Sequence, residues 1–507
     1  MPTNRETFPI EVVGGLVTNL PPIQQGSKLP GSARRLVNFE NSIKGGYRRI
    51  NGFTKWDINI VPTVTSSSQV LGVGFFDGAV VAAREGKIYT STGSGWTQIA
   101  TGRTQTTKHR FTRFNFDGTR KIMGLDSSNY PYTWDGSSFV NVNGTTDVLA
   151  CTHAVAFKDH MFYAKADLVT YSIPFDETDF TVANGSGNFR MPGDVTGMIV
   201  FRKRLFIFTE EEIKVLDGSS LSDFILTSVS EDVGCVSEDT IQEVAGDIAF
   251  LSADGVRLLG ATDRIGDFSN ALSSKSVQSD LTDFTSTYNQ FSSVVIRGKS
   301  QYRVMGWVSG RDSTLTEGFI GTQAPPEGLK GNHQEHDFHW SVTKGIKSYS
   351  SDSVVYTGTE YVIFAGDTEY VYRLDNGDDF DGTAITSSYW TPYLTFNDPM
   401  LRKTMYKKSM YFGPEGDVTG SVNLNFDLND SSKIQPPTIT FSASGGGVVF
   451  GSGVFGTSTY RSAPSAIVDC LLVGSGFNVS LKFEFTASNE PFIIDTILVE
   501  HSTEDRR

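Results

Sequence analysis

The amino-acid sequence predicts an all-β protein, on three observations. Gly and Phe are plentiful (51 and 36 of 507 residues) in a text rich in Ser, Thr and Asp, which suits short strands joined by many turns. No long Ala-, Leu-, Glu- and Lys-rich segment carries a helical period of apolar residues. Instead, a pattern of strand, tight polar turn and strand recurs along the chain at a nearly constant spacing.

Residues 1–58 are predicted to form an N-terminal docking arm. Positions 1–56 carry eight Lys or Arg against three Asp or Glu, although the whole chain has a net charge of −14. Within LVNFENSIKGGYRRINGF (36–53), Gly45 and Gly46 allow a tight turn and aromatic residues supply apolar anchors. Arginines can fork onto carboxylates of the body or of an adjacent subunit. We expect the contacts of the arm to come from Arg34, Arg35, Tyr47, Arg48, Arg49 and Phe53.

Residues 59–386 are predicted to form a β-propeller with six or seven blades. Five copies of the repeated pattern have turn anchors spaced by 40, 42, 44 and 43 residues, at Asp77, Asp117, Asp159, Lys203 and Gly246. Two looser copies begin at Val294 and Ser353. A unit of about 40–45 residues with up to four strands has the size of a propeller blade, and several must stack to bury both faces. An array of unrelated hairpins in a sandwich is the alternative.

Residues 387–507 are predicted to form a separate antiparallel β-sandwich. The 40-residue period is lost here and apolar residues alternate with polar ones, as in strands that have one wet face. Two segments show this alternation, with inward positions at Val422, Leu424, Phe426, Leu428, Val479, Leu481, Phe483 and Phe485.

Cysteine usage and hydropathy bound the class of protein. Cys151, Cys235 and Cys470 are odd in number and far apart, so we expect packed thiols and neither a zinc site nor a disulfide framework. No apolar run approaches the ~18 residues of a membrane span, and no apolar secretory leader is recognisable, so we expect no membrane insertion.

Several short motifs resemble catalytic or ligand-binding motifs, but the flanking elements or spacing that each function needs are missing. GSGVFG (451–456) matches a dinucleotide-binding fingerprint but no helix signal follows it. RGKS (297–300) reads as a hairpin turn. The histidines of HQEHDFHW (333–340) and the acids of LDNGDDFDG (374–382) contain metal-ligand types, but exposed loops and turns are the favoured interpretation. We therefore predict no catalytic residue, no metal and no cofactor.

The opening segment resembles a known family. Residues 14–56 are similar to the N-terminal signature of podovirus tail nozzle proteins, also called tail tubular protein B, and of the related phage DNA-stabilisation tail proteins. The matching residues are Leu36, Asn38, Gly46, Tyr47, Arg48, Arg49, Gly52 and Phe53. The stretches SSYWTPYLTF (387–396) and PFIIDTILVE (491–500) also resemble the family.

The resemblance implies a non-enzymatic structural protein of the virion tail, made in the cytoplasm of a bacterial host. It implies six copies in a ring below the portal and adaptor, with fibres or spikes attached outside and genome DNA passing through without sequence-specific binding. A DNA grip at residues 34–49 would fit poorly in a conduit that must release its cargo, so we favour the docking arm.

The acidic body suits a conduit, because an acidic lining repels phosphate. Residues 210–283 carry sixteen acids against four bases. The candidate residues of an acidic lumen are Glu210, Glu211, Glu212, Glu231, Asp232, Glu238 and Asp239. A solvated acidic surface is the other interpretation.

Two rival functions stay open. A propeller that binds a receptor or glycan would need aromatic pockets repeated from blade to blade, but Trp96 and Trp134 give way to Phe180 and Phe224 in the next copies. A glycan-cleaving propeller enzyme would need an acid and nucleophile pair, and no pair of carboxylates stands out.

Overall fold

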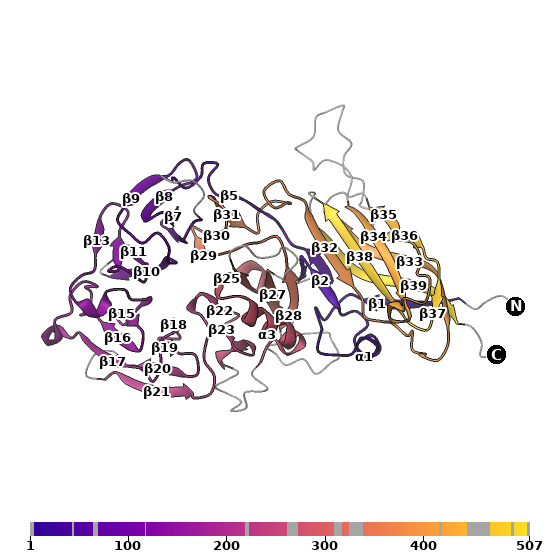
Figure 1. The fold of residues 1–507 in the computed structure, drawn as a ribbon, viewed down its shortest axis with the longest axis horizontal. Helices are drawn as coiled ribbons and strands as arrows, with labels where there is room; N and C mark the ends of the chain where they lie inside the picture. The colour runs from indigo at the N-terminus through magenta and orange to yellow at the C-terminus, as the bar shows by residue number, and fades with distance from the viewer. Residues whose placement is uncertain are drawn as a thin grey trace.

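The protein consists of a β-propeller at one end and two large β-sheets at the other (Figure 1). The computed structural model describes residues 5–42, 45–63, 69–116, 118–218, 223–260, 272–308, 317–323, 338–414, 418–443, 467–487 and 491–503. Within these ranges nearly all regular structure is strand, so the all-β prediction is confirmed.

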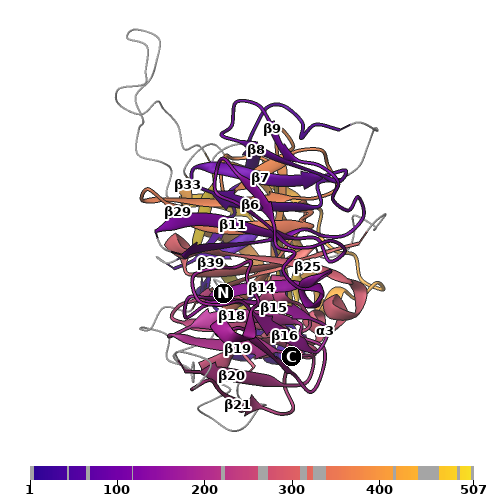
Figure 2. The same cartoon turned by 90° about the vertical axis from the view of Figure 1, so that its left-hand side faces the viewer.

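The propeller has six blades, of which five are separate four-stranded antiparallel sheets and one, blade 5, is part of a nine-stranded sheet. The first four blades use consecutive strands. Blade 1 is β6 (Gly72–Phe76), β7 (Ala79–Arg84), β8 (Lys87–Ser91) and β9 (Thr97–Ala100). Blade 2 is β10 (Arg110–Phe116), β11 (Thr119–Leu125), β12 (Tyr132–Trp134) and β13 (Phe139–Asn141). Blade 3 is β14 (His153–Phe157), β15 (His160–Lys165), β16 (Leu168–Tyr171) and β17 (Gly187–Arg190). Blade 4 is β18 (Gly197–Phe201), β19 (Arg204–Phe208), β20 (Ile213–Asp217) and β21 (Ile225–Ser230). Figure 2 shows these blades from β9 at the top to β21 at the bottom.

The remaining blades complete the ring with help from distant segments. A three-stranded sheet follows blade 4, with β22 (Gln242–Val244), β23 (Asp247–Ser252) and β24 (Gly255–Leu258), and the helix α3 (Gln278–Thr287) comes next. Blade 5 is β25 (Gln290–Ile296), β26 (Gln301–Trp307), β27 (Gly318–Gln323) and β28 (Phe338–Thr343). Blade 6 is β29 (Ser350–Tyr356), β30 (Thr359–Ala365), β31 (Val371–Leu374) and, from the N-terminal segment, β5 (Phe53–Lys55).

The predicted turn anchors occupy one recurring position, the tight turn between the first two strands of a blade. Two successive residues have positive φ at Asp77–Gly78 (49° and 88°), Lys158–Asp159 (50° and 64°) and Arg202–Lys203 (48° and 67°). Ala245–Gly246 does the same between β22 and β23. Such paired positive values are those of the two-residue hairpin turn whose twist matches that of the flanking strands. Asp117 lies outside the described residues.

Two sheets form the other end of the molecule, and their strands pair antiparallel except at the parallel junction of β2 with β28. The first contains β1 (Glu6–Glu11), β3 (Phe39–Asn41), β4 (Tyr47–Arg49), β33 (Lys403–Pro414), β36 (Ile467–Leu471), β37 (Ser475–Gly476) and β39 (Phe492–Thr503). The second continues blade 5, since β28 is followed in the sheet by β2 (Arg35–Val37), β32 (Ile385–Trp390), β38 (Val479–Ala487), β34 (Val418–Phe426) and β35 (Ile439–Ala443). The short helix α1 (Pro22–Lys28) precedes β2.

The aromatic core between these sheets draws on both ends of the chain. Phe485 of the second sheet lies 4.7 Å from Phe492 and 6.0 Å from Phe39 of the first sheet, measured between ring centroids. The predicted inward positions of β34 and β38 are buried, but Leu428 lies beyond β34 and is 51% exposed, so that position was predicted wrongly. A separate sandwich confined to residues 387–507 is not confirmed, because β1–β4 share these sheets and β2 joins one of them to blade 5.

The strand β5 closes the propeller through its first residue. Phe53 is buried and its ring centroid lies 5.0 Å from that of Phe380, 5.1 Å from that of Phe364 and 4.9 Å from that of Tyr372. The backbone of the preceding Gly52 approaches Asp379 so closely that a Cβ atom would lie 1.7 Å from its carbonyl oxygen. Glycine is therefore required before the strand can pair with β31.

We expect Phe53→Ala to lower the free energy of unfolding by about 3–5 kcal/mol, because it removes a buried ring without refilling the space. Urea denaturation followed by circular dichroism measures this loss. Ile58→Ala is the matched control, since Ile58 is 84% exposed and its truncation should change stability by less than about 0.5 kcal/mol. Equal losses in the two variants would contradict the role of Phe53 in closure.

Candidate functional site

A buried ion cluster joins the N-terminal segment to blades 5 and 6. We call it the Glu40 cluster, and its members are Glu40, Arg48, Lys299, Gln301, Arg303 and Asp375. Glu40 in β3 lies directly opposite Arg48 in β4, with Oε1 3.1 Å from Nη1. The same carboxylate accepts hydrogen bonds from Lys299 Nζ at 2.8 Å and from Arg303 Nη2 at 3.0 Å.

Asp375, which follows β31, supplies the second carboxylate of the Glu40 cluster, against the three cations Arg48, Lys299 and Arg303. Its Oδ1 lies 2.8 Å from Lys299 Nζ and 3.3 Å from Arg303 Nη2. Burial alone would raise the pKa of Asp375, but the charges of Arg303 and Lys299 hold it below its usual value. Glu40 and Arg303 are almost completely buried, so each charge depends on its partners in place of water.

The other predicted arm residues near the cluster are also used within the chain. The Tyr47 hydroxyl donates to the Gly31 carbonyl oxygen at 3.1 Å, and its ring packs edge-on against Tyr389 at 5.1 Å. Arg49 is buried and donates from Nη2 to the Asp378 carbonyl oxygen at 2.9 Å. Tyr47 and Arg49 are therefore part of the fold of one chain. An additional role between subunits stays a prediction.

Arg34 and Arg35 face a different environment, a groove between β2 and β32. The Arg35 guanidinium lies 5.0 Å from the centre of the Trp390 ring and donates from Nε to Ser388 Oγ at 3.2 Å. Lys482 of β38 also lies over Trp390, at 4.2 Å. We call this hollow of about 540 Å³ the basic groove, and it is lined by Pro22, Arg34, Arg35, Trp390, Tyr393, Leu428, Ser480 and Lys482.

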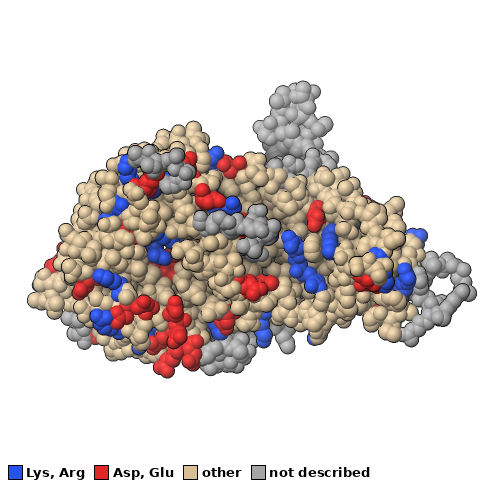
Figure 3. All heavy atoms as spheres, viewed as in Figure 1, with Lys and Arg blue, Asp and Glu red and all other residues tan. Residues whose placement is uncertain are grey.

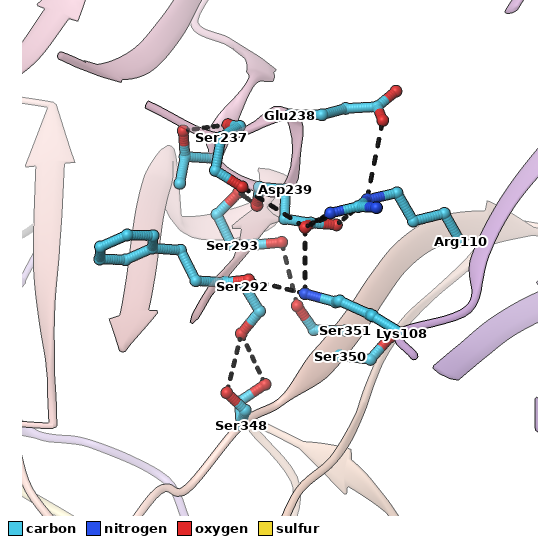
Figure 4. A network of polar contacts seen from close by, with 12 residues as sticks. Lys108, Arg110, Ser237, Glu238, Asp239, Ser292, Ser293, Ser348, Ser350 and Ser351 are labelled. Atoms are coloured by element: carbon cyan, nitrogen blue, oxygen red, sulfur yellow. Dashed lines mark hydrogen bonds and ion pairs between the residues drawn. The ribbon is translucent and has the colours of Figure 1, made fainter. Parts of the chain in front are cut away.

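The axis of the propeller is occupied by a second ion network (Figure 4). Asp239, from the short 3₁₀ turn η3 (Glu238–Thr240), accepts from Arg110 Nη2 at 2.8 Å and pairs with Lys108 Nζ at 3.1 Å. Lys108 Nζ also donates to the Phe291 carbonyl oxygen at 2.7 Å. These contacts connect the start of blade 2 to the three-stranded sheet and to blade 5.

A small hollow lies beside this network. A hollow of about 160 Å³ lies among the first strands of blades 1, 2, 5 and 6, and Asp239 and Arg110 line it together with Ser292 and Ser351. Burial alone would raise the pKa of Asp239, but the neighbouring Arg110 and Lys108 lower it below its usual range. A network of paired charges therefore fills the centre of the propeller.

The seven predicted lumen acids lie in two separate places. Glu238 and Asp239 belong to the axial network, where Glu238 Oε2 lies 3.8 Å from Arg110 Nε and also contacts His153. The others are on the surface, where a hollow at blade 4 is lined by Glu210, Glu211, Glu212, Glu231 and Asp194, and Asp232 is exposed beside it. Figure 3 shows a group of acidic side chains in this region. Which acids face the lumen of a ring stays a prediction.

The other motifs from the sequence have structural roles, as far as they lie within the described residues. RGKS forms the turn between β25 and β26, as predicted. In LDNGDDFDG, Asp375 belongs to the Glu40 cluster and Asp381 pairs with Lys55 at 3.1 Å. His339 is buried in β28, whereas His333, His336 and the GSGVFG motif lie outside the described residues. All three cysteines are buried free thiols, as predicted.

Metal-ion clusters and membrane-spanning helices are both absent from the described ranges. They contain no group of three or more His, Cys, Asp or Glu side chains placed to hold a metal ion. No helix within the same ranges is long and apolar enough to span a bilayer.

The sequence analysis missed the partners of the predicted arginines. Glu40 offered a signal, because it is one of only three acids in residues 1–56 and a hairpin about Gly45–Gly46 brings it opposite Arg48. Lys299, Arg303, Trp390 and Lys482 carried no such local signal, because they lie more than 200 residues away.

Comparisons with known proteins return propellers of low similarity. No family model matches the sequence, and no curated protein matches it. The N-terminal domain of Nup159 is 10% identical, with a TM-score of 0.34 over 66% of this chain and 97% of that domain. Hsv2 from Kluyveromyces lactis is 11% identical, with a TM-score of 0.32 over 66% of this chain and 95% of that protein. The extracellular domain of a hybrid two-component system from B. thetaiotaomicron is 9% identical, with a TM-score of 0.40 over 78% of this chain and 44% of that domain.

We expect Glu40→Gln to lower the free energy of unfolding by about 3–5 kcal/mol, because the buried Arg303 and the partly exposed Arg48 and Lys299 lose an anionic partner. Chemical denaturation measures the change. Asp367→Asn is the matched control, since Asp367 pairs with Lys347 at 3.1 Å where both side chains are more than 40% exposed. The control should lose less than about 1 kcal/mol. A loss in Glu40→Gln no larger than in the control would contradict a structural role for the cluster.

We expect His109 to make the fold sensitive to mild acid. Burial lowers the pKa of His109 from 6.5 to about 4, so between these values the unfolded chain binds a proton that the folded chain does not. Stability should therefore fall by about 3 kcal/mol as the pH drops from 6.5 to 4. His109→Gln should flatten this part of the curve of unfolding free energy against pH. Parallel curves for the two proteins would show that His109 is not responsible.

Proposed function

We propose that the protein is a structural component of a phage tail, a subunit of a six-fold nozzle ring below the portal and adaptor. The observation that carries this proposal is the role of the residues by which the chain resembles tail nozzle proteins. Tyr47 and Arg48 anchor the N-terminal segment between the sheets and blade 5, and Phe53 closes blade 6. Because these residues connect the N-terminal segment to the sheets and the blades, proteins of the same architecture would be expected to share them.

The conduit in this proposal is enclosed by several copies of the chain. Duplex DNA is far wider than the small hollow near the centre of one propeller, because its major groove alone is about 12 Å wide. The axis of one propeller holds a hollow of only about 160 Å³ crossed by the pair of Arg110 and Asp239. DNA would therefore pass along the centre of the ring, while each propeller serves as a closed building block.

A propeller that binds a receptor or glycan is the second candidate, and it has less support. Such a site needs open aromatic faces, but Trp134 packs against Phe76 at 5.6 Å and Trp96 packs in the core between blades 1 and 6. The arm and the shared sheets also have no part in a glycan-binding function, whereas they offer contact surfaces in a ring.

Negative-stain electron microscopy of the purified protein, alone and mixed with the adaptor and fibre proteins encoded beside it, tests the proposal. We expect six-fold rings with a central hole wide enough for duplex DNA, because the resemblance to tail nozzle proteins implies six copies around a DNA conduit. Compact monomers under both conditions would count against the nozzle. Binding of the pure protein to a glycan array without any ring would favour the second candidate.

A further inference from the structure

Three cations converge on the basic groove, and none of them forms an ion pair with Glu484, the carboxylate whose charge acts on Lys482. Among the described residues, no ion pair involves Arg34, Arg35 or Lys482, and no Asp or Glu lines the groove. This contrasts with Arg48, Lys299 and Arg303, which are all paired within the Glu40 cluster. In a chain with a net charge of −14, the groove is a local concentration of positive charge. Figure 3 shows Lys and Arg side chains gathered over the region labelled β2 and β32 in Figure 1.

The fold places these cations close enough to repel one another, which disfavours the charged form of Lys482. Pairing of Arg35 with Trp390 in register across β2 and β32 places the guanidinium beside the indole ring. Burial lowers the pKa of Lys482, and the charges of Arg34 and Arg35 lower it further against the opposing effect of Glu484. Like charges brought together in this way are relieved by an anion that enters between them.

The shape of the groove selects a compact anion. Trp390 has both Arg35 and Lys482 over its ring, and Tyr393 is only 8% exposed, so neither offers an open face on which a base or sugar could stack. The neighbouring hollow of about 350 Å³ also contains Arg34 and Arg35, but Asp280 and Asp283 of α3 line it and oppose an anion there. The side that faces Lys482 is therefore the favourable one.

We propose that the basic groove binds phosphate groups, and that their source is a nucleic-acid backbone. One carboxylate brings a single negative charge to three cations, whereas a phosphate dianion or two successive phosphodiesters bring two. Arginine guanidinium groups match phosphate oxygens in a bidentate geometry, and lysine adds a point charge. Of the five bases at residues 34–49, Arg48 and Arg49 are used inside the fold and Lys44 lies outside the described residues. The proposed contact therefore revises the sequence-based expectation that residues 34–49 do not bind DNA. It involves only Arg34 and Arg35 of that stretch, together with Lys482 of β38.

The test compares binding of fluorescent 20-nucleotide single strands and 20-base-pair duplexes to the full chain by anisotropy, over a series of salt concentrations. The triple variant R34Q/R35Q/K482Q should bind about tenfold or more weakly, and its slope of log affinity against log salt should be shallower by about 2–3. The matched control R120Q/R190Q/R204Q removes the same charge from exposed positions on blades 2, 3 and 4 and should bind like the unmodified chain. The double variant R34Q/K482Q keeps the packing of Arg35 and guards against misfolding.

Two competitors distinguish a phosphate site from a carboxylate site, because inorganic phosphate carries only phosphate and polyglutamate carries only carboxylates. Inorganic phosphate should displace the oligonucleotide at millimolar concentration, and polyglutamate of equal charge should displace it less well. Equal weakening in the control triple, or better competition by polyglutamate, would overturn the phosphate site. Calorimetric binding of inorganic phosphate that is lost in the triple variant, without any binding of DNA, would support the site and assign it to free phosphate. Because all of these measurements use the isolated chain, their failure is distinct from a failure to form rings.

Discussion

The buried carboxylate of Glu40 is the constraint on which the assembly of this fold depends. A charge in the interior is tolerated only where opposite charges and hydrogen bonds replace water. Its partners come from β4, from the hairpin of blade 5 and, through Asp375, from the end of blade 6. The N-terminal segment, both blades and the adjoining sheet must therefore reach their final positions together, because any partial arrangement would leave charges buried without partners.

Backbone hydrogen bonds of β2 also connect the propeller to the sheets at the other end of the molecule. Val37 of β2 pairs with Val342 of blade 5 on one side and with Ser388 of β32 on the other, so one sheet runs from the propeller into the far end of the protein. Blade 6 is closed by β5 from the same segment. The N-terminal 55 residues thus connect blade 5, blade 6 and the sheets at the far end of the protein. The sequence had predicted only a docking arm for this segment.

Local patterns in the sequence predicted local structure well and long-range partners poorly. The spacing of Asp77, Asp159 and Lys203 identified the blades, because a two-residue turn with positive φ recurs at the same place in each copy of the repeat. Alternation in β38 identified a strand with one buried face. By contrast, no repeated pattern in the sequence signals the pairing of β5 with β31 or the approach of Lys482 to Arg35. Each of these contacts joins segments separated by hundreds of residues. The seven acids shared one stretch of sequence, yet Asp239 pairs with cations at the axis while Glu210 lies at the surface.

The pairing of β5 with β31 also sets an order of events during synthesis. Phe53 leaves the ribosome about 320 residues before Leu374, its partner in the ladder, and at ~5–20 residues per second this is a wait of tens of seconds. During that time blades 1–4, which use only consecutive strands, can form one after another. The nascent chain must meanwhile keep an apolar strand and a set of unmatched charges from associating elsewhere. Blade 6 can therefore be completed only after Leu374 has been synthesised, whereas the pairing within blades 1–4 needs no strand outside residues 72–230.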